Sequence, residues 1–287
     1  MKSEKFFYDY DDYEEGGKDA LTLAQEVLAD PDLPDLDELV IGCWGESYDN
    51  SVQSLLDEFT AQAGKLQNIK SLCIGDMDYE ECEVSWIEQG SYEQLLAALP
   101  GLERLMIKGS VGLSLGKIRH AALQEIEIIC GGLPKNVLHE LAESELPALT
   151  KLNLYLGVED YGFDGDIEDV KVLLRSPLMR QLTYLGLGDS EIQDEVVAAV
   201  LAVLPLERLQ VLDFSNGTLT DQGGQLLLDA QDKLKNLQKI DLTYHFLSDE
   251  MMERLKATGL PFVLDDQQET ETDEDDGYIY RFPMLTE

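Results

Sequence analysis

Acidic side chains dominate the residues of this chain that could do chemistry. The sequence contains 58 aspartates and glutamates against 21 lysines and arginines, for a formal net charge of -37. Carboxylates can transfer protons, hold hard cations or attract basic partners. The same charge repels nucleic-acid phosphates and anionic membranes. We therefore expect a protein or peptide partner with a basic patch, and neither a nucleic-acid partner nor a membrane.

Histidine and cysteine, the other common catalytic and metal-ligating residues, are few and poorly spaced. The three histidines (His120, His139 and His245) form no H-E-x-x-H motif, and the four cysteines form no C-x-x-C pair. Residues 15–19 (EGGKD) lack the first glycine and the Ser/Thr of a phosphate-binding loop. The sequence therefore predicts no catalytic residue, no metal site and no cofactor. Without a disulfide or zinc framework, the cysteines are expected to be reduced and mostly buried.

A short apolar pattern, L-x-x-L-x-L with isoleucine or phenylalanine allowed, predicts the elements that position the carboxylates. Its eight copies begin at Leu36, Ile69, Leu102, Leu123, Leu149, Leu182, Leu209 and Leu237. Their mean separation of about 29 residues is at the long end of leucine-rich repeats. Alternating apolar residues indicate a short strand in each copy, and a degenerate ninth strand is expected at 260–264.

The segments between the strands have apolar residues at helical spacing. They predict helices over 51–64, 91–99, 134–144, 167–176, 191–201 and 220–231, and a helix that follows the N-cap Ser248. One strand and one helix cannot bury their apolar faces alone, so the repeats must stack. The expected fold class is α/β, a leucine-rich-repeat solenoid that curves as a right-handed superhelix with concave parallel strands and convex helices.

Charge and periodicity divide the chain into three parts. Residues 1–35 are expected to form an acidic N-terminal cap with one helix, and residues 36–264 a solenoid of eight to nine repeats. Residues 265–287 are expected to form an acidic, flexible tail, whose aromatic cluster at 278–282 could dock back or extend the sheet. The chain has no apolar secretory segment, and its longest apolar run is 196–206. A cytoplasmic monomer is expected.

The loops after the strands carry the candidate binding residues. Parallel strands end at a common rim, and aromatic side chains are frequent anchors of protein interfaces. The candidates are Trp44, Glu46, Asp76, Asp78, Glu80, Tyr155, Glu159, Asp160, Tyr184 and Asp189. Two alternatives stay open, because Trp44 could merely pack a loop and the carboxylates could cap helices or bind Ca²⁺ or Mg²⁺. No segment matches the D-x-[DN]-x-[DN]-G calcium loop.

Residues 209–223 (LQVLDFSNGTLTDQG) resemble the ribonuclease-inhibitor-like class of leucine-rich repeats. Other segments resemble a family of uncharacterised bacterial cytoplasmic leucine-rich-repeat proteins. They are 41–46 (IGCWGE), 79–87 (YEECEVSWI), 112–115 (GLSL), 156–162 (LGVEDYG) and 184–192 (YLGLGDSEI). The resemblance covers roughly 36–264 and implies a bacterial source and the repeat fold, but no known activity.

These observations favour a protein without enzymatic activity. Our interpretation is a protein-binding module or scaffold that uses the concave face and the acidic rim. One alternative is an acidic inhibitor of a basic enzyme, by fold-level analogy with the ribonuclease inhibitor. A carboxylate-based metal-binding protein is the other.

Overall fold

The computed structural model describes residues 2–272 and 279–285 and divides into two compact units. The first unit contains Met1–Cys130 and His139–Leu149, and the second contains Gly131–Leu138 and Thr150–Thr286. The division passes through helix α5 (Lys135–Glu143). Each unit is a stack of strands followed by helices, so each is described separately.

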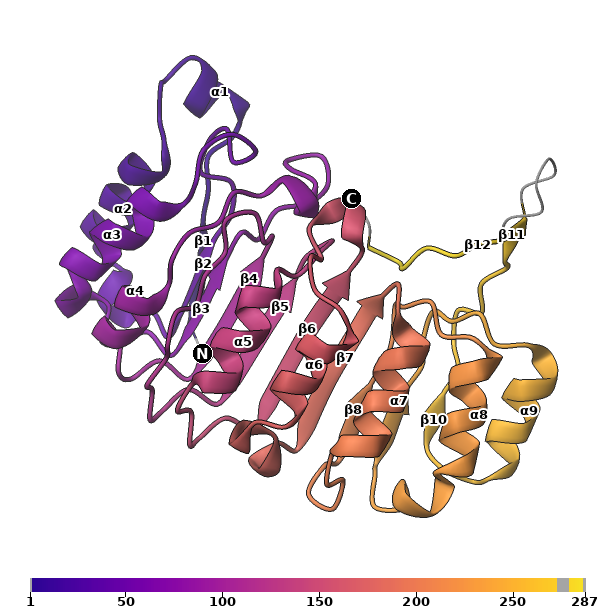
Figure 1. Ribbon diagram of the computed structural model, residues 1–287. Helices are drawn as coiled ribbons and strands as arrows, with labels where there is room; N and C mark the ends of the chain where they lie inside the picture. Colours follow the sequence, from indigo (N-terminus) through magenta and orange to yellow (C-terminus); the bar gives the residue numbers. More distant parts are fainter. Residues whose placement is uncertain (1, 273–278, 286–287) are drawn as a thin grey trace. The chain divides into compact units, whose positions relative to one another are not determined.

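The first unit has five parallel strands in chain order (Figure 1). They are β1 (Ser3–Phe6), β2 (Glu38–Ile41), β3 (Ser71–Ile74), β4 (Arg104–Lys108) and β5 (Glu125–Ile129). The α-helices are α1 (Tyr10–Glu14), α2 (Ala20–Ala29), α3 (Gln53–Ala61) and α4 (Glu93–Ala98), and the 3-10 turns are η1 (Leu33–Asp35), η2 (Ala63–Lys65) and η3 (Val84–Trp86). Register is constant, since Leu39, Leu72, Leu105 and Ile126 lie side by side on β2 to β5.

The second unit repeats this arrangement. Its parallel strands are β6 (Lys151–Gly157), β7 (Tyr184–Ser190), β8 (Val211–Asp213), β9 (Lys239–Asp241) and β10 (Phe262–Val263). Its helices are α6 (Ile167–Leu174), α7 (Gln193–Val203), α8 (Asp221–Asp229) and α9 (Asp249–Ala257), with the 3-10 turns η4 (Glu159–Tyr161), η5 (Pro177–Gln181) and η6 (Gln231–Lys233). Two short strands, β11 (Glu271–Thr272) and β12 (Ile279–Tyr280), pair antiparallel.

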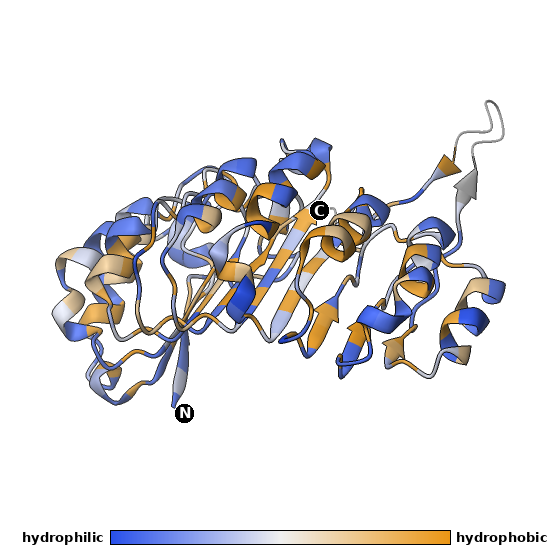
Figure 2. Ribbon diagram, turned by 60° about the horizontal axis from the view of Figure 1, so that its bottom comes forward, coloured by the Kyte–Doolittle hydropathy of each residue, from blue (hydrophilic) through white to orange (hydrophobic). Residues whose placement is uncertain are grey.

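The repeated leucine positions form the core of each unit. Leu72 and Leu105 in the first unit, and Leu185 and Leu212 in the second, are buried beneath the helices that cover one face of the strands. Figure 2 shows the resulting apolar bands along the strands. Burial of one such side chain stabilises the fold by about 1.5–3 kcal/mol. The predicted fold class, an α/β leucine-rich-repeat solenoid, is confirmed.

The N-terminal segment differs from the expectation of one helix. Residues 1–35 contain two α-helices, α1 and α2, whose N-caps Asp9 and Asp19 both form capping boxes. Strand β1 precedes them and pairs with β2, so the sheet begins one strand before the first leucine pattern. The expectation of a single helix is therefore wrong. Strand β1 lacks the L-x-x-L-x-L pattern, and its place in the sheet comes from its pairing with β2.

The tail also differs from a wholly flexible segment. The amide of Gln268 donates a hydrogen bond of 2.7 Å to the carbonyl oxygen of His245, and the amide of Tyr244 donates one of 2.9 Å to Asp265. Residues 279–285 lie against the second unit through contacts given below. The expectation of flexibility at 273–278, which includes Tyr278 of the aromatic cluster, lies outside the described residues.

The four cysteines are buried and unbridged, as predicted. All of them (Cys43, Cys73, Cys82 and Cys130) belong to the first unit. Burial raises the pKa of the Cys73 thiol to about 12 and that of Cys82 to about 11. Among residues 2–272 and 279–285, no helix has the length and apolar character needed to cross a membrane.

Candidate functional site

Trp44 is the first candidate in the chain, and the structure buries it. The residue follows β2, is 1% exposed, and its indole Nε1 donates a hydrogen bond of 2.8 Å to the carbonyl oxygen of Asn50. A buried indole N–H needs such an acceptor, so the loop folds back over the ring. The prediction that Trp44 binds a partner is wrong, and its packing alternative is correct.

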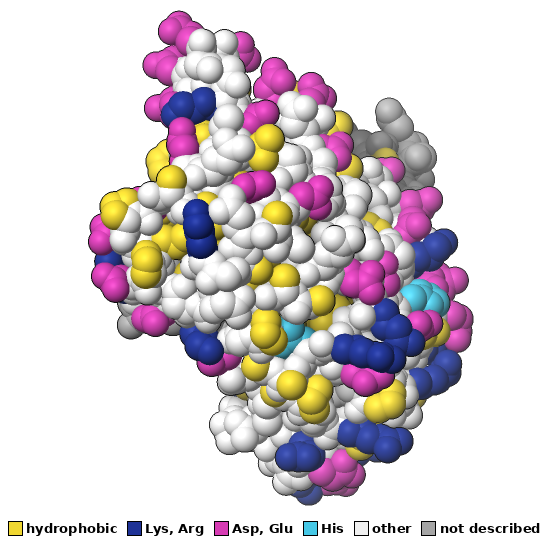
Figure 3. Space-filling model, turned by 90° about the vertical axis from the view of Figure 1, so that its left-hand side faces the viewer, with side chains coloured by type: hydrophobic (Ala, Val, Ile, Leu, Met, Phe, Trp, Pro, Cys, Tyr) yellow, Lys and Arg dark blue, Asp and Glu magenta, His cyan; other side chains and the backbone are white. Residues whose placement is uncertain are grey.

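Asp76, the next acidic candidate, already has cationic partners within the first unit. Its carboxylate lies 2.6 Å from Lys108 Nζ and 3.3 Å from Lys5 Nζ. Burial alone would raise the pKa of Asp76, but the two ammonium groups hold it below its ordinary value. Asp78 and Glu80 are exposed, and Asp78 accepts a hydrogen bond of 3.0 Å from the amide of Glu80. Figure 3 shows acidic side chains with lysines and arginines interspersed among them.

A hollow of ≈ 470 Å³ in the first unit is lined by Trp44, the exposed Glu46 and Lys18. The Lys18 ammonium lies 3.0 Å from the carboxylate of Asp12 and 3.3 Å from that of Glu26. This hollow therefore already contains a cation with two acidic partners.

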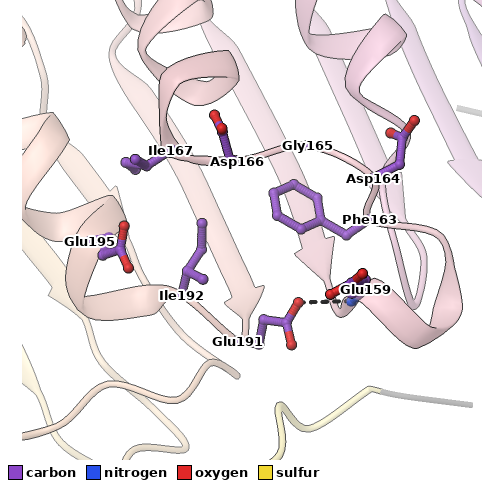
Figure 4. Close-up of a pocket in the computed structure, with 9 residues that line it drawn as sticks. All are labelled: Glu159, Phe163, Asp164, Gly165, Asp166, Ile167, Glu191, Ile192 and Glu195. Carbon is purple, nitrogen blue, oxygen red and sulfur yellow. Dashed lines mark hydrogen bonds between the residues drawn. The ribbon is translucent and has the colours of Figure 1, made fainter.

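The second unit contains a hollow with carboxylates but no lysine or arginine among the described residues of its lining, which we call the acidic hollow (Figure 4). Its volume is ≈ 340 Å³, and its lining residues are Glu159, Phe163, Asp164, Gly165, Asp166, Ile167, Glu191, Ile192 and Glu195. These residues follow β6 and β7 and include the starts of α6 and α7. Glu191 accepts a hydrogen bond of 2.8 Å from the amide of Glu159, which ties the two strand-end loops together.

The acidic hollow combines carboxylates with an apolar floor. Phe163 is buried, and Ile167 and Ile192 are half-buried. In the described part of the chain, no lysine or arginine nitrogen lies within 4.0 Å of the carboxylates of Glu159 or Glu191. A lysine or arginine side chain matches this lining, because its stem is apolar and its tip is cationic.

The other two carboxylates of this loop have structural roles. Asp166 caps α6 by accepting a hydrogen bond of 2.7 Å from the amide of Glu168. Asp164 accepts one of 2.7 Å from the amide of Lys135. Part of the predicted acidic rim thus caps a helix, which was one of the alternatives that the sequence left open. Asp160, another candidate, is exposed.

The candidate tyrosines lie on the strand face that the helices leave open, and both are half-buried. Tyr155 Oη accepts a hydrogen bond of 3.1 Å from Asn216 Nδ2. Tyr184 Oη donates a hydrogen bond to the Asp213 carboxylate, and the Lys151 ammonium lies 5.3 Å from the centre of its ring. These contacts hold both rings in place, and each ring stays half-buried.

Asp189, the last candidate, is 0% exposed and is not on an open rim. Its Oδ1 accepts a hydrogen bond of 2.9 Å from the amide of Leu285, while its Oδ2 is buried without a partner. Burial raises the pKa of Asp189 to about 8, although the Leu285 hydrogen bond works in the opposite direction. The prediction of an exposed binding carboxylate is corrected, because residues 279–285 cover it.

The covering segment brings a cation to the same part of the second unit. Arg281 and Ile279 join Glu191, Asp194 and Glu195 in lining a second hollow of ≈ 370 Å³. The sequence left open whether the aromatic cluster docks or extends the sheet, and its described residues dock. Sequence reasoning missed Asn216, Tyr244 and Phe246, which contact this segment, because their contacts span large sequence separations.

The structure shows structural roles for the histidines whose contacts can be followed. His120 is buried, with Nε2 at 2.9 Å from the carbonyl oxygen of Leu99 and Nδ1 accepting from the amide of Leu123. His245 is buried, and burial lowers its pKa. Within the described ranges, no group of three or more His, Cys, Asp or Glu residues has the arrangement of a metal site.

The stacked strand-and-helix repeats, with their buried leucine positions, define a leucine-rich-repeat fold. A protein from Bacteroides fragilis, whose crystal structure was a Northeast Structural Genomics Consortium target, is 41% identical to this chain with a TM-score of 0.86. The match covers 93% of this chain and 75% of that chain. This chain belongs to the same family as the Bacteroides fragilis protein.

A second solved structure, an internalin from Listeria monocytogenes, is 18% identical with a TM-score of 0.42, covering 84% of this chain and 63% of that one. No family model and no curated protein matches the chain. The ribonuclease-inhibitor-like class of the repeats stays a prediction.

Proposed function

We propose that this protein is a non-enzymatic protein-binding module that holds a basic side chain of its partner in the acidic hollow. The observation that carries the proposal is the lining itself, in which the carboxylates of Glu159, Glu191 and Glu195 share one hollow with the buried, apolar Phe163. A guanidinium or ammonium group there gains charge-assisted hydrogen bonds, and its methylene stem covers the ring. The partner is a protein or peptide with a basic patch, and neither a nucleic acid nor a membrane.

The surrounding surface supports the same proposal. Tyr155 and Tyr184 offer half-exposed rings on the open strand face, and tyrosine is a frequent interface anchor. The exposed Glu46, Asp78 and Glu80 add to the net charge of -37, which accelerates encounter with a basic partner. We further propose that the protein works as a cytoplasmic monomer.

The test uses an array of arginine-containing peptides and the same peptides with glutamine in place of arginine. We expect binding to the arginine set alone, and association that slows with salt more than dissociation accelerates. Glu159→Lys should lower affinity about tenfold or more, because it replaces an attractive charge of the acidic hollow with a repulsive one. Glu207→Lys, at an exposed glutamate that precedes β8, is the matched control.

The tyrosines are tested separately. Tyr155→Ala and Tyr184→Ala should each weaken binding by about 1–3 kcal/mol if they are anchors. Unchanged affinity in the hollow and tyrosine variants, together with loss of binding on charge reversal at Lys171, Arg175 and Arg254, would place the interface on the helices instead.

A further inference from the structure

Three successive repeats of the second unit share an unusual backbone conformation at one position. Asp189, Asn216 and Tyr244 each lie two residues after the last apolar position of the repeat pattern, which is buried in all three repeats (Leu187, Phe214 and Leu242). Their φ angles are +50°, +66° and +61°, in the left-handed region. Aspartate and asparagine tolerate this region, but a bulky residue such as tyrosine does so at a cost. We call these three residues the left-handed row.

Every member of the left-handed row holds the same segment, Ile279–Leu285, which we call the docked segment. Asp189 Oδ1 accepts from the amide of Leu285 at 2.9 Å, and the carbonyl oxygen of Asn216 accepts from the amide of Met284 at 2.8 Å. Tyr244 Oη donates to the carbonyl oxygen of Phe282 at 3.3 Å. Each of the three successive repeats therefore binds one backbone group of the docked segment.

Side chains of the docked segment add two further contacts. The Arg281 guanidinium lies 6.0 Å from the centre of the Phe246 ring, and its hollow includes Glu191, Asp194 and Glu195. The rings of Tyr280 and Phe282 stack at 6.1 Å with an interplanar angle of 11°. Arg281 lies between Tyr280 and Phe282 in the sequence. It lines the same hollow as three acidic residues, which form an acidic wall (Glu191, Asp194 and Glu195).

The fit of the docked segment is incomplete. Asp189 Oδ2 and Arg281 Nε are buried without partners, and each unpaired polar group costs about 1–3 kcal/mol. Phe282 is 54% exposed and Met284 is 60% exposed, so two large apolar side chains gain little from docking. A segment that satisfies these groups can therefore replace the present one.

We propose that the left-handed row is a peptide-binding surface, that the docked segment is its internal occupant, and that the partner supplies an extended peptide with arginine between two aromatic residues. This inference rests on the proposed function and deepens it, since it states the chemistry of the partner. The arginine enters the hollow now lined by Arg281, while the peptide backbone pairs with Asn216 and Asp189.

The probe is a fluorescein-labelled synthetic peptide with the sequence of residues 279–285 (IYRFPML), titrated into the full-length chain. Arg281→Ala with Leu285→Pro in the chain weakens the internal competitor, because it removes the guanidinium and the amide that donates to Asp189. We expect this double variant to bind the probe at least tenfold more tightly than the unmodified chain. A probe with glutamate in place of arginine should lose binding, because the wall is acidic.

Asp189→Gly, added to the double variant, tests the row without disturbing the fold. Glycine adopts a φ of +50° readily and removes the carboxylate that accepts from Leu285. Binding of the probe should fall about tenfold. The matched control is Asp266→Gly, at an exposed aspartate with φ +56° outside the row, which should leave probe binding unchanged.

Occupancy of the row is followed by the NMR signals of the Met284 and Leu285 amides. In the unmodified chain both should be protected from exchange and should shift when excess unlabelled probe is added. Equal probe affinity for the unmodified chain and the double variant would overturn the inference. Protection that rises with protein concentration alongside dimer formation would also overturn it, in favour of exchange of the segment between copies.

The two proposals fail separately. If arginine peptides bind and respond to Glu159→Lys, but binding of the probe does not depend on the row, the proposed function stands and this inference falls. If the probe depends on the row but the acidic hollow is irrelevant to arginine peptides, the row stands and the acidic hollow has no part in recognition.

Discussion

The strand ends of the two units use the left-handed conformation in different ways. In the first unit it belongs to glycines, Gly75 with φ +89° and Gly109 with φ +88°. A Cβ on Gly109 would lie 2.4 Å from Ile87 Cβ, so the chain packs directly onto that backbone. In the second unit Gly157 also takes the conformation, with φ +74°, but so do Asp189, Asn216 and Tyr244, which contact another segment instead. The same kind of turn can thus close a loop tightly or present groups for recognition.

The two units also treat a strand-end carboxylate in opposite ways. Lys108 and Lys5 hold the pKa of Asp76 below its ordinary value despite the burial of that residue. Burial without a cation raises the pKa of Asp189 to about 8. The first carboxylate is therefore a fixed structural charge, whereas the second is sensitive to whatever covers it.

The largest effect is expected from placing a side chain on a glycine turn. Gly109→Ala should lower the free energy of unfolding by about 3 kcal/mol, from left-handed strain and from overlap with Ile87. Asn216→Gly should lower it by no more than about 1 kcal/mol, because glycine fits the backbone and only the hydrogen bond to Tyr155 is lost. Urea unfolding of both variants measures this. Equal destabilisation would remove the proposed difference between the two kinds of turn.

The second effect is a pH dependence of segment docking. The Asp189 pKa is raised to about 8 when covered and is expected near 3.8 when uncovered, so the covered state binds the proton more tightly. Docking is therefore strongest below pH 3.8, weakens as the pH rises from 3.8 to about 8, and is weakest above about 8. From pH 5 to 7 the docking equilibrium should fall by up to about a hundredfold.

The Met284 and Leu285 amide shifts follow that equilibrium. Asp189→Asn keeps an acceptor for Leu285 and should abolish the pH dependence. The neighbouring Tyr244 has its pKa raised by burial and by Asp189, so it stays neutral throughout this range. A pH dependence that survived Asp189→Asn would point to another group.

A smaller effect on the free energy of unfolding is expected at Asp76 in the first unit. Asp76→Asn should cost about 1 kcal/mol, since the Asp76 carboxylate and its two lysines remain partly solvated. Because the Asp76 pKa is lowered, its stabilisation is present above its ordinary value and is lost as the pH falls through the lowered one. Thermal unfolding of Asp76→Asn and Lys108→Met, singly and together, isolates the pair. Additive losses would show that the pair contributes nothing.

The smallest effect is expected from chelation. EDTA should leave the midpoint of thermal unfolding unchanged, because the leucine positions supply the core and the carboxylates can cap helices or stay hydrated. A clear fall would show that the acidic hollow holds a structural cation, and would make the two units differ in metal dependence.

The sequence predicts the repeats well because each leucine position reports its own burial. Leu72, Leu105 and Leu212 are all in the core, and the helices follow their predicted ranges within a few residues. Strand β1 escapes prediction because its pairing with β2 is a tertiary contact. No periodic pattern encodes such a contact.

The site is predicted less well, for a related reason. Glu159 does line a hollow, since a strand-end acid next to a helix start is a local feature. Whether Trp44 or Asp189 is exposed depends on what lies over each of them. For Asp189, the covering residue is Leu285, which lies 96 positions away in the sequence. Single-repeat reasoning cannot supply this information.

The location of the cysteines offers a way to watch one half of the molecule alone. The thiols of Cys73 and Cys82 carry their protons at neutral pH, and all four thiols are buried in the first unit. A thiol reagent can therefore modify this protein only as fast as the first unit opens. The rate of alkylation, followed by mass spectrometry, therefore measures the opening of the first unit. Local opening of the second unit does not change this rate.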